Sequence, residues 1–388
     1  MGEQSVLSGF CVWLKKAKPF LAMVSLQFGY AGMYIITSVS LRKGMNHYVL
    51  AVYRHVFATL VIAPLAFFLE RKTRPKLTLP TFLRIMALGF LEPVLDQNLY
   101  YVGIKYTSAT LASTSINMLP AVTFILALIF RLEKVNLKKF HSLAKVIGTV
   151  ITVMGAMIMT LYSGPIIHFI RSRGAIHHQS TTASANTHHY FIGILCLLGS
   201  ICCWSGFFIL QSFTLERYPA ELSLTALICL MGTVEGAIVS LIFERDMSAW
   251  KLGFNSRLLA ASYTGVVCSG IAYYVQGVVI KERGPVFVTS FSPLCMIITA
   301  TLGTIILSEL VHLGSILGAI IIVIGLYTVV WGKSKDLKSI EESALTGEKG
   351  NVQDLPITNN DHGGIIDGPA RVLNIPTANN IKDYVMSK

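Results

Sequence analysis

Seven ionisable side chains interrupt the long apolar stretches of this sequence. They are Arg54, His55, Arg84, Glu92, Asp96, Lys145 and Glu235. An ionisable group inside hydrocarbon is costly unless it is paired or hydrated, so such residues are found mainly where they bind or move a polar ligand. They are the first candidates for a functional site.

Two of these residues, Glu92 and Asp96, lie four positions apart and therefore on one face of a helix. Pro93, next to Glu92, lacks an amide N–H, so it interrupts the backbone hydrogen bonds and frees carbonyl groups for a ligand. The two carboxyl groups either belong to a ligand site or form a bonded pair that only fixes helix packing. The residues alone leave both interpretations open.

Hydrogen-bond donors lie near these carboxyl groups. A zwitterionic amino acid needs acceptors for its ammonium group and donors for its carboxylate. We expect Asp96 to supply the acceptors, and the amides of Gln97, Asn98 and Asn117 to supply donors. Arg54 lies about 6 Å from the midpoint of its apolar stretch at 1.5 Å per residue. It therefore either holds a carboxylate bidentately or extends outward to the headgroups.

The other polar residues also have structural interpretations. Asn117 either belongs to a polar seam between helices or, because it precedes the recurring Pro120, faces a cavity. Arg84 and Lys145 lie near predicted cytosolic helix ends, where we expect their side chains to extend to the headgroups. For Glu235 we expect a structural hydrogen bond.

Ten apolar windows position these side chains, each close to the roughly 20 residues that cross about 30 Å of hydrocarbon. They are 20–41, 48–69, 82–104, 108–130, 141–162, 190–213, 222–243, 258–280, 286–308 and 313–332. Backbone polar groups in lipid must bond within their own segment, so these windows predict helices. The predicted fold class is an all-α integral membrane protein with ten transmembrane helices.

The composition supports this fold class. Of 388 residues, 53% are hydrophobic and 13% charged, whereas a soluble globular domain carries charge on about 25% of its residues. The net charge of +12 does not indicate nucleic acid as a partner, because Lys and Arg occur in short clusters between apolar runs. With the N-terminus inside, the inner segments as far as Lys338 carry 17 Lys and Arg residues and the outer segments 8, so both termini are expected in the cytosol.

The first five windows and the last five share ordered features. The matched pairs are Gly32 with Gly206 and Glu70 with Glu244 at an offset of 174, Tyr100 with Tyr273 and Pro120 with Pro293 at 173, and Gly148 with Gly318 and Gly155 with Gly325 at 170. Because five is odd, the second set crosses the membrane in the opposite direction. Inverted repeats of this kind are typical of secondary transporters, which bind substrate between the repeats. Tyr30 and Trp204 occupy equivalent positions and are expected either to form two walls of such a cavity or to serve as packing aromatics.

The predicted organisation has five parts. They are a cytosolic N-terminal segment (1–19), a first repeat of five helices (20–165), a connecting extracytosolic loop (166–189), a second repeat of five helices (190–332) and a disordered cytosolic tail (333–388). The tail is rich in Gly, Asn, Asp and Pro and has little apolar surface to pack. The loop holds the pairs His177-His178 and His188-His189, which we interpret as part of a solvated polar segment rather than a metal site or a pH sensor.

Signatures of other function classes do not occur. The seven cysteines show no paired spacing, which predicts neither a disulfide framework nor a metal or other cofactor. An intramembrane enzyme is a rival class, since two carboxyl groups four residues apart can perform acid–base catalysis. No His-Glu-x-x-His motif and no Ser/His pair on adjacent windows accompanies them, so we do not expect an enzyme.

Several short motifs carry a resemblance to a known family. They are Gln27-Phe28-Gly29-Tyr30-Ala31-Gly32, Tyr53-Arg54, Glu92-Pro93, Asp96-Gln97-Asn98-Leu99-Tyr100-Tyr101, Tyr106-Thr107-Ser108-Ala109-Thr110, Asn117 with Pro120, and Gly284-Pro285-Val286-Phe287-Val288. From about Phe20 to Lys333 the sequence resembles the plant nodulin-like EamA transporters, also called usually-multiple-acids-move-in-and-out or walls-are-thin-related proteins, of the drug/metabolite transporter superfamily.

The resemblance implies a ten-helix fold with a central cavity. It also implies passage of amino acids or related organic acids, auxin in one branch, across the plasma membrane or tonoplast. We expect a bidirectional facilitator or exporter of amino acids in the plasma membrane, with a small molecule and the lipid bilayer as partners; a proton-coupled transporter of auxin or another organic acid is the alternative. The substrate-binding residues expected are Asp96, Gln97, Asn98, Asn117, Arg54, Tyr30, Trp204, Gln27 and Glu92.

Overall fold

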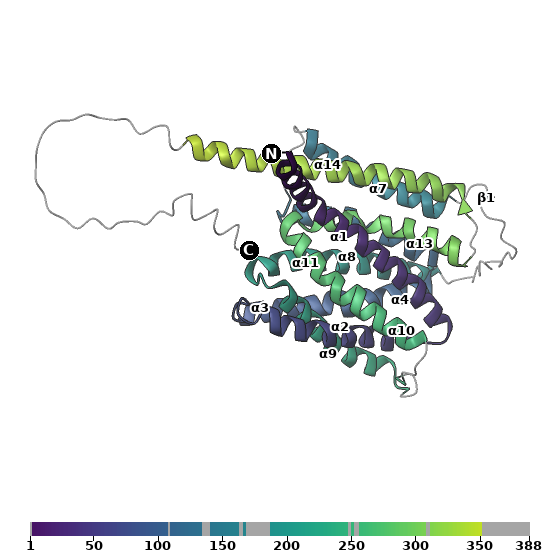
Figure 1. Ribbon diagram of the computed structural model, residues 1–388. Helices are drawn as coiled ribbons and strands as arrows, with labels where there is room; N and C mark the ends of the chain where they lie inside the picture. Colours follow the sequence, from purple (N-terminus) through teal and green to yellow (C-terminus); the bar gives the residue numbers. More distant parts are fainter. Residues whose placement is uncertain are drawn as a thin grey trace, which may run out of the picture. The chain divides into compact units, whose positions relative to one another are not determined.

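The computed structural model describes residues 2–107, 109–133, 140–162, 166–167, 187–246, 250–251, 256–307 and 311–350. Within these ranges the chain is almost entirely helical (Figure 1). Its internal contacts divide it into the units Met1–Ser339 and Ile340–Lys388. The helix bundle that concerns function lies in the first unit.

The first half of the bundle runs from α1 to α7. It comprises α1 (Gly2–Arg42), α2 (His47–Leu69), α3 (Leu79–Gly89), the π-helical segment η1 (Phe90–Asp96), α4 (Gln97–Tyr106), α5 (Ala109–Ile116), α6 (Leu119–Ile129) and α7 (Phe140–Leu161). Local sequence sets where some helices begin. The Asn46 side chain caps α2 by accepting a hydrogen bond from the Tyr48 amide at 2.8 Å, and Pro80 stands in the first turn of α3.

The second half runs from α8 to α14. It comprises α8 (Thr187–Arg217), α9 (Glu221–Phe243), α10 (Ser256–Tyr263), the π-helical segment η2 (Thr264–Ile271), α11 (Ala272–Arg283), α12 (Pro285–Ser290), α13 (Ser292–Leu307) and α14 (Leu313–Gly350). Two-residue strands, β1 (Ile166–Ile167) and β2 (Val311–His312), pair antiparallel with Ile166 opposite His312.

The two halves depart from regular helix at equivalent points. The π-helical segment that begins at Phe90 recurs at Thr264, and the break between α5 and α6 recurs between α12 and α13. In η1 the interruption coincides with Pro93, as predicted from its missing N–H. In η2 no proline is present. There Gly265 lies so close to α2 that a Cβ on it would be 2.8 Å from the Phe57 Cβ. The repeat predicted from sequence is therefore also a repeat of backbone irregularity.

Among the described residues, eight helical segments are long and apolar enough to cross a membrane. They are Ala17–Leu41, His47–Leu69, Phe140–Met159, His189–Arg217, Glu221–Phe243, Ser256–Arg283, Pro285–Leu302 and Leu313–Lys335. The described parts of the predicted windows 82–104 and 108–130 are helical as well, but the first contains Glu92 and Asp96 and the second is divided at Asn117. The chain is thus a multi-pass α-helical membrane protein, and the part that the structure describes holds eight candidate spans.

Small residues let α7 and α14 pack closely, and the two helices lie side by side (Figure 1). A Cβ on Gly148 of α7 would be 2.7 Å from the Val329 amide nitrogen, and one on Gly155 would be 2.8 Å from the Ile322 nitrogen. The two helices therefore approach closely along these glycines, as small residues allow in membrane helices.

Parts of the predicted loop and tail have regular secondary structure. Helix α14 continues to Gly350, where the sequence predicted disorder from residue 333. The remainder of the predicted tail, 351–388, lies outside the described residues. At the ends of the predicted connecting loop, Ile166 and Ile167 form β1 and α8 begins at Thr187. The loop residues 168–186 lie outside the described ranges.

Lys145 is buried instead of extending to the headgroups. Its side chain is 2% exposed, and its Nζ donates to Glu133 Oε2 at 3.2 Å. Glu133 also pairs with Lys333 of α14. The prediction for Lys145 was wrong, because a carboxylate within reach compensates the burial of the ammonium group. Arg84 is half-buried and donates to the Phe213 carbonyl oxygen at 3.3 Å.

Candidate functional site

A cavity of about 520 Å³ lies between the two halves of the bundle. Its wall is formed by α1, α2, η1, α4 and α5 of the first half and by α8 and η2 of the second. Arg54, Glu92 and Asp96 are its charged lining residues among those described, and we call it the charged chamber. Its volume falls within the range of about 300–1,000 Å³ that is usual for small-molecule sites.

The Arg54 guanidinium is held by both halves. Its Nε donates to Ser269 Oγ at 2.6 Å, and its Nη2 lies 3.8 Å from Glu92 Oε1. Glu92 Oε2 in turn accepts a hydrogen bond from the Tyr273 hydroxyl. Because 3.8 Å exceeds the length of a charge-assisted hydrogen bond, Glu92 orients Arg54 without occupying its donors fully. A guanidinium has five N–H donors, so Arg54 can also bind an anion that enters the chamber.

Asp96 is fixed across the interface between the halves. Its side chain is buried, and its Oδ1 accepts a hydrogen bond from Ser200 Oγ of α8 at 2.5 Å. A carboxylate offers about four acceptor positions, so one serine hydroxyl leaves capacity for a further donor. Both residues line the charged chamber, and Asp96 can therefore accept from a ligand ammonium group.

A second cavity of about 320 Å³ adjoins the first. The two share the wall residues Tyr30, Tyr34, Tyr100, Ile116 and Trp204. Three amide side chains line this second cavity, Gln27, Asn117 and Gln276, and we call it the amide chamber. Gln276 Nε2 donates to the Tyr30 hydroxyl at 3.0 Å, and Asn117 Nδ2 donates to Met296 Sδ at 3.1 Å.

The structure brings together eight of the nine residues that the sequence nominated. Arg54, Glu92, Asp96 and Gln97 line the charged chamber, Gln27 and Asn117 line the amide chamber, and Tyr30 and Trp204 line both. Asn98 is elsewhere. Its Nδ2 donates to the Val94 carbonyl oxygen at 2.6 Å, and it lines a small pocket of about 10 Å³ that shares Gln97 and Tyr101 with the charged chamber. Neighbouring residues on a helix point in different directions, so Asn98 does not follow Gln97 into the chamber.

Sequence reasoning missed the partners that the second half supplies. These are the hydroxyls of Ser200, Ser269 and Tyr273 and the amide of Gln276. Tyr273 could have been found, because it is the repeat counterpart of Tyr100, which lines both chambers. Serines are common in membrane helices as interhelical contacts, so nothing in the sequence distinguished Ser200 or Ser269.

Four of the seven ionisable candidates line neither chamber: Arg84 and Lys145, described above, and Glu235 and His55. Glu235 is half-buried, and its Oε2 has no hydrogen-bond partner among the described residues, so the structural hydrogen bond predicted for it is not formed at that atom. His55 is 1% exposed, and its Nδ1 lies 2.7 Å from the Ala51 carbonyl oxygen of its own helix. In the part of the chain that the structure describes, no group of three or more His, Cys, Asp or Glu residues is arranged to hold a metal ion.

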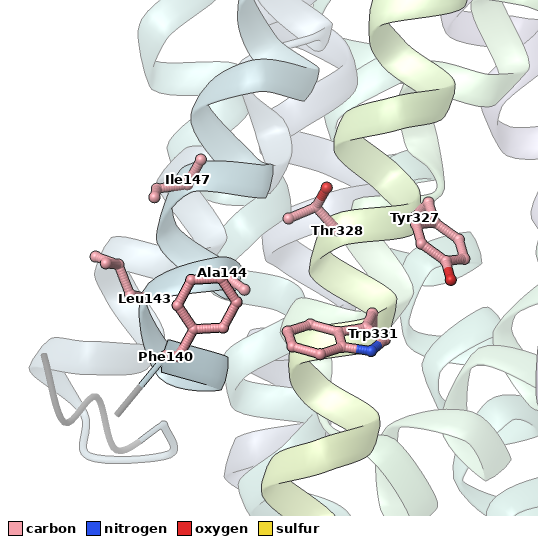
Figure 2. Close-up of a pocket in the computed structure, with 7 residues that line it drawn as sticks. All are labelled: Phe140, Leu143, Ala144, Ile147, Tyr327, Thr328 and Trp331. Carbon is pink, nitrogen blue, oxygen red and sulfur yellow. The ribbon is translucent and has the colours of Figure 1, made fainter. Parts of the chain in front are cut away.

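A further groove of about 340 Å³ lies on the outer side of the bundle between α7 and α14. Figure 2 shows Phe140 and Trp331 facing each other there, with ring centroids 5.9 Å apart. The lining residues are Phe140, Leu143, Ala144, Ile147, Tyr327, Thr328 and Trp331. None carries a charge, and Phe140 is 75% exposed, as expected for a surface in contact with lipid. The groove is not a candidate for polar chemistry.

Comparison with known proteins identifies the frame in which these chambers lie. The sequence profile of the EamA-like transporter family matches residues 18–161 and 191–331. The chain belongs to this family. A WAT1-related protein of Arabidopsis thaliana is 62% identical over 353 residues, covering 89% of each chain. A second WAT1-related protein of that plant is 63% identical over 349 residues, covering 89% of this chain and 92% of the relative.

The resemblance to plant members of the drug/metabolite transporter superfamily is thereby confirmed. A crystal structure with 16% sequence identity superposes with a TM-score of 0.62, covering 81% of this chain and 98% of that one, and shows the likeness of the fold. As an EamA-family protein, the chain is a membrane transporter. Both regions matched by the family profile contribute lining residues to both chambers.

Proposed function

We propose that this protein is a facilitator of amino acids, which it moves across the membrane without coupling to protons and in either direction. The observation that carries the proposal is that Arg54 and Asp96, of opposite charge, line one chamber between the two halves. The substrate carboxylate pairs with the Arg54 guanidinium, and the ammonium group donates to Asp96. A zwitterion uses both groups, and Glu92 with Ser200 holds them in place.

The proposed topology has ten crossings with cytosolic termini in the plasma membrane. The charged chamber reaches Leu41, Leu50 and Ile104, near helix ends that the charge asymmetry assigns to the outside. At the opposite end, Phe20 packs on Phe287 with ring centroids 5.2 Å apart. This arrangement supports an outward-facing conformation, in which substrate enters from or leaves to the exterior.

A proton-coupled transporter of auxin or another organic acid is the second candidate, because acidic side chains line the charged chamber. An organic monocarboxylate would use Arg54 but has no ammonium group for Asp96. Facilitation and coupling also differ in energetics: in a facilitator, a pH gradient alone does not concentrate substrate.

Uptake of labelled glutamine into liposomes tests the proposal. We expect Arg54→Gln and Asp96→Asn each to lower uptake at least about tenfold, since a hydrogen bond to a charged group contributes about 1.5–3 kcal/mol. Glu282→Gln is the matched control, because Glu282 is exposed, pairs with Arg283 and lines neither chamber.

Two results would contradict the proposal. The first is that a pH gradient drives glutamine above its equilibrium level in the wild-type protein, and that Asp96→Asn abolishes this accumulation but keeps downhill flux. This result would make the protein proton-coupled. The second is transport of an organic monocarboxylate, but not of glutamine, by the wild-type protein and by Asp96→Asn alike.

A further inference from the structure

The amide chamber differs from the charged chamber in its chemistry. None of its described lining residues carries a formal charge. Its amides come from three places in the fold: Gln27 from α1, Asn117 from the break between α5 and α6, and Gln276 from α11. They are 3%, 3% and 4% exposed, so bulk water hydrates them little.

The two chambers adjoin each other, and aromatic residues form the wall that they share. Tyr30, Tyr34, Tyr100 and Trp204 line both. The Gln276 amide holds the Tyr30 hydroxyl at 3.0 Å, and this bond fixes the ring between the chambers. If the substrate carboxylate and ammonium group bind Arg54 and Asp96, as proposed above, the side chain has the amide chamber as its neighbouring space.

From this juxtaposition we infer that the amide chamber is the side-chain subsite. It selects uncharged side chains that both donate and accept hydrogen bonds, and glutamine is the simplest probe. The inference rests on the proposed function and adds the part of the molecule that discriminates among amino acids.

Charge provides the first reason. Removing an ion from water is costly unless a partner of opposite charge compensates it. The amide chamber offers no cation to a glutamate side chain and no anion to a lysine side chain among its described lining residues. Arg54, Glu92 and Asp96 line the other chamber, where the α-groups of the substrate engage Arg54 and Asp96.

The amides provide the second reason. Asn117 Nδ2 donates to the Met296 thioether sulfur, and a thioether is a weak acceptor. The carbonyl oxygen of a substrate side chain in the chamber is a better acceptor. Replacing the bond from Asn117 to sulfur by a bond from Asn117 to this oxygen therefore favours binding. A substrate with a purely aliphatic side chain offers no hydrogen-bond partner to the buried amides of the chamber. Sites built to form hydrogen bonds discriminate strongly against analogues that lack the bonding group.

Uptake by the wild-type protein in liposomes tests the inference with glutamine, glutamate, lysine and leucine at equal concentrations. Glutamine and glutamate have nearly the same shape, so they isolate the effect of charge. We expect glutamine uptake to exceed that of each other substrate at least about tenfold, a ratio equivalent to about 1.4 kcal/mol. Glutamate or lysine uptake as fast as that of glutamine overturns selection by charge, and equal leucine uptake overturns the role of the amides. If none of the four is transported, the proposed function itself fails.

Variants of Asn117 test whether this chamber carries the selectivity. Asn117→Asp adds a carboxylate and is expected to raise the ratio of lysine to glutamine uptake at least about tenfold. Asn117→Leu, the control at the same position, removes the amide without adding charge and should lower glutamine uptake without a gain for lysine. Uptake is normalised to the amount of each variant that elutes as a monodisperse peak in size-exclusion chromatography in detergent. If both variants keep the wild-type ratios among the four substrates, the subsite lies elsewhere.

Discussion

Two glycine-to-alanine substitutions test the close packing of α7 against α14. Gly148→Ala perturbs this contact, and Gly206→Ala is its control. Gly148 in α7 faces α14, where a Cβ would be 2.7 Å from the Val329 amide nitrogen and 2.9 Å from the Gly325 carbonyl oxygen. Real Cβ atoms essentially never approach another atom within 3.0 Å, and these two neighbours are backbone atoms that no rotamer change can move. Gly206 in α8 has no heavy atom within 4 Å of the same position.

The magnitudes follow from two opposing terms. Alanine is favoured over glycine in a helix interior by about 1 kcal/mol, and this gain applies to both variants. Overpacking costs about 1–3 kcal/mol and applies only to Gly148→Ala, because α7 and α14 must separate along the glycine contacts. Gly206→Ala should therefore be as stable as the wild type or more stable, and Gly148→Ala should be less stable than Gly206→Ala by about 1–3 kcal/mol.

Thermal unfolding in one detergent, followed by circular dichroism, measures the difference. The expected order of midpoints is Gly206→Ala at or above wild type, with Gly148→Ala lowest. Equal midpoints for the two variants would refute the close approach of α7 and α14. Uptake per folded molecule should be unchanged in Gly148→Ala, because neither chamber includes this residue.

Three further predictions concern ion pairs, the tail and topology. Glu133→Gln removes a buried carboxylate that pairs with the ammonium groups of Lys145 and Lys333 and should lower stability by about 3–5 kcal/mol. Glu221→Gln breaks a pair whose Lys281 side chain is 49% exposed and should cost at most about 1 kcal/mol. Equal losses of stability in the two variants would contradict the burial of the Glu133 pairs. Deletion of residues 340–388 should leave uptake in liposomes near wild type, since the contacts place this segment in a unit of its own, and a loss of uptake would show that the bundle depends on it. Tags at the two termini should both be digested by protease from the cytosolic side, and protection of only one would require an odd number of crossings.

The sequence predicted the periodic parts of the fold well, because hydrophobic runs and repeated punctuation are local signals. The apolar windows and the interruption at Pro93 both follow from residue type and spacing. The helical continuation of α14 to Gly350 did not, since it occurs where apolar content no longer indicates a span. The burial of Lys145 could not be predicted from its apolar window, because its partner Glu133 lies 12 residues away and precedes the helix.

For the site, the sequence identified charges but not their contacts. Arg54, Glu92 and Asp96 stand out because charge is rare in apolar segments. Their partners Ser200 and Ser269 are 104 and 215 positions from Asp96 and Arg54, and tertiary structure alone brings them together. Asn98 was nominated by its position beside Gln97, although helix geometry directs it to the Val94 carbonyl oxygen.

The duplicated frame has become chemically unequal in its two halves. At an offset of 174 residues, Arg54 and Glu92 have Ile228 and Val266 as counterparts, so the second half carries neither charge. It contributes neutral groups instead, the hydroxyls of Ser269 and Tyr273, which bond Arg54 and Glu92 respectively. If the second half carried both charges as well, two more ionised groups would join Arg54, Glu92 and Asp96 in one chamber, at a desolvation cost that grows with each ion. Confining the charges to one half while the other supplies hydrogen bonds leaves one cation and one acid able to bind a zwitterion, and it makes each of them depend on a contact across the interface between the halves.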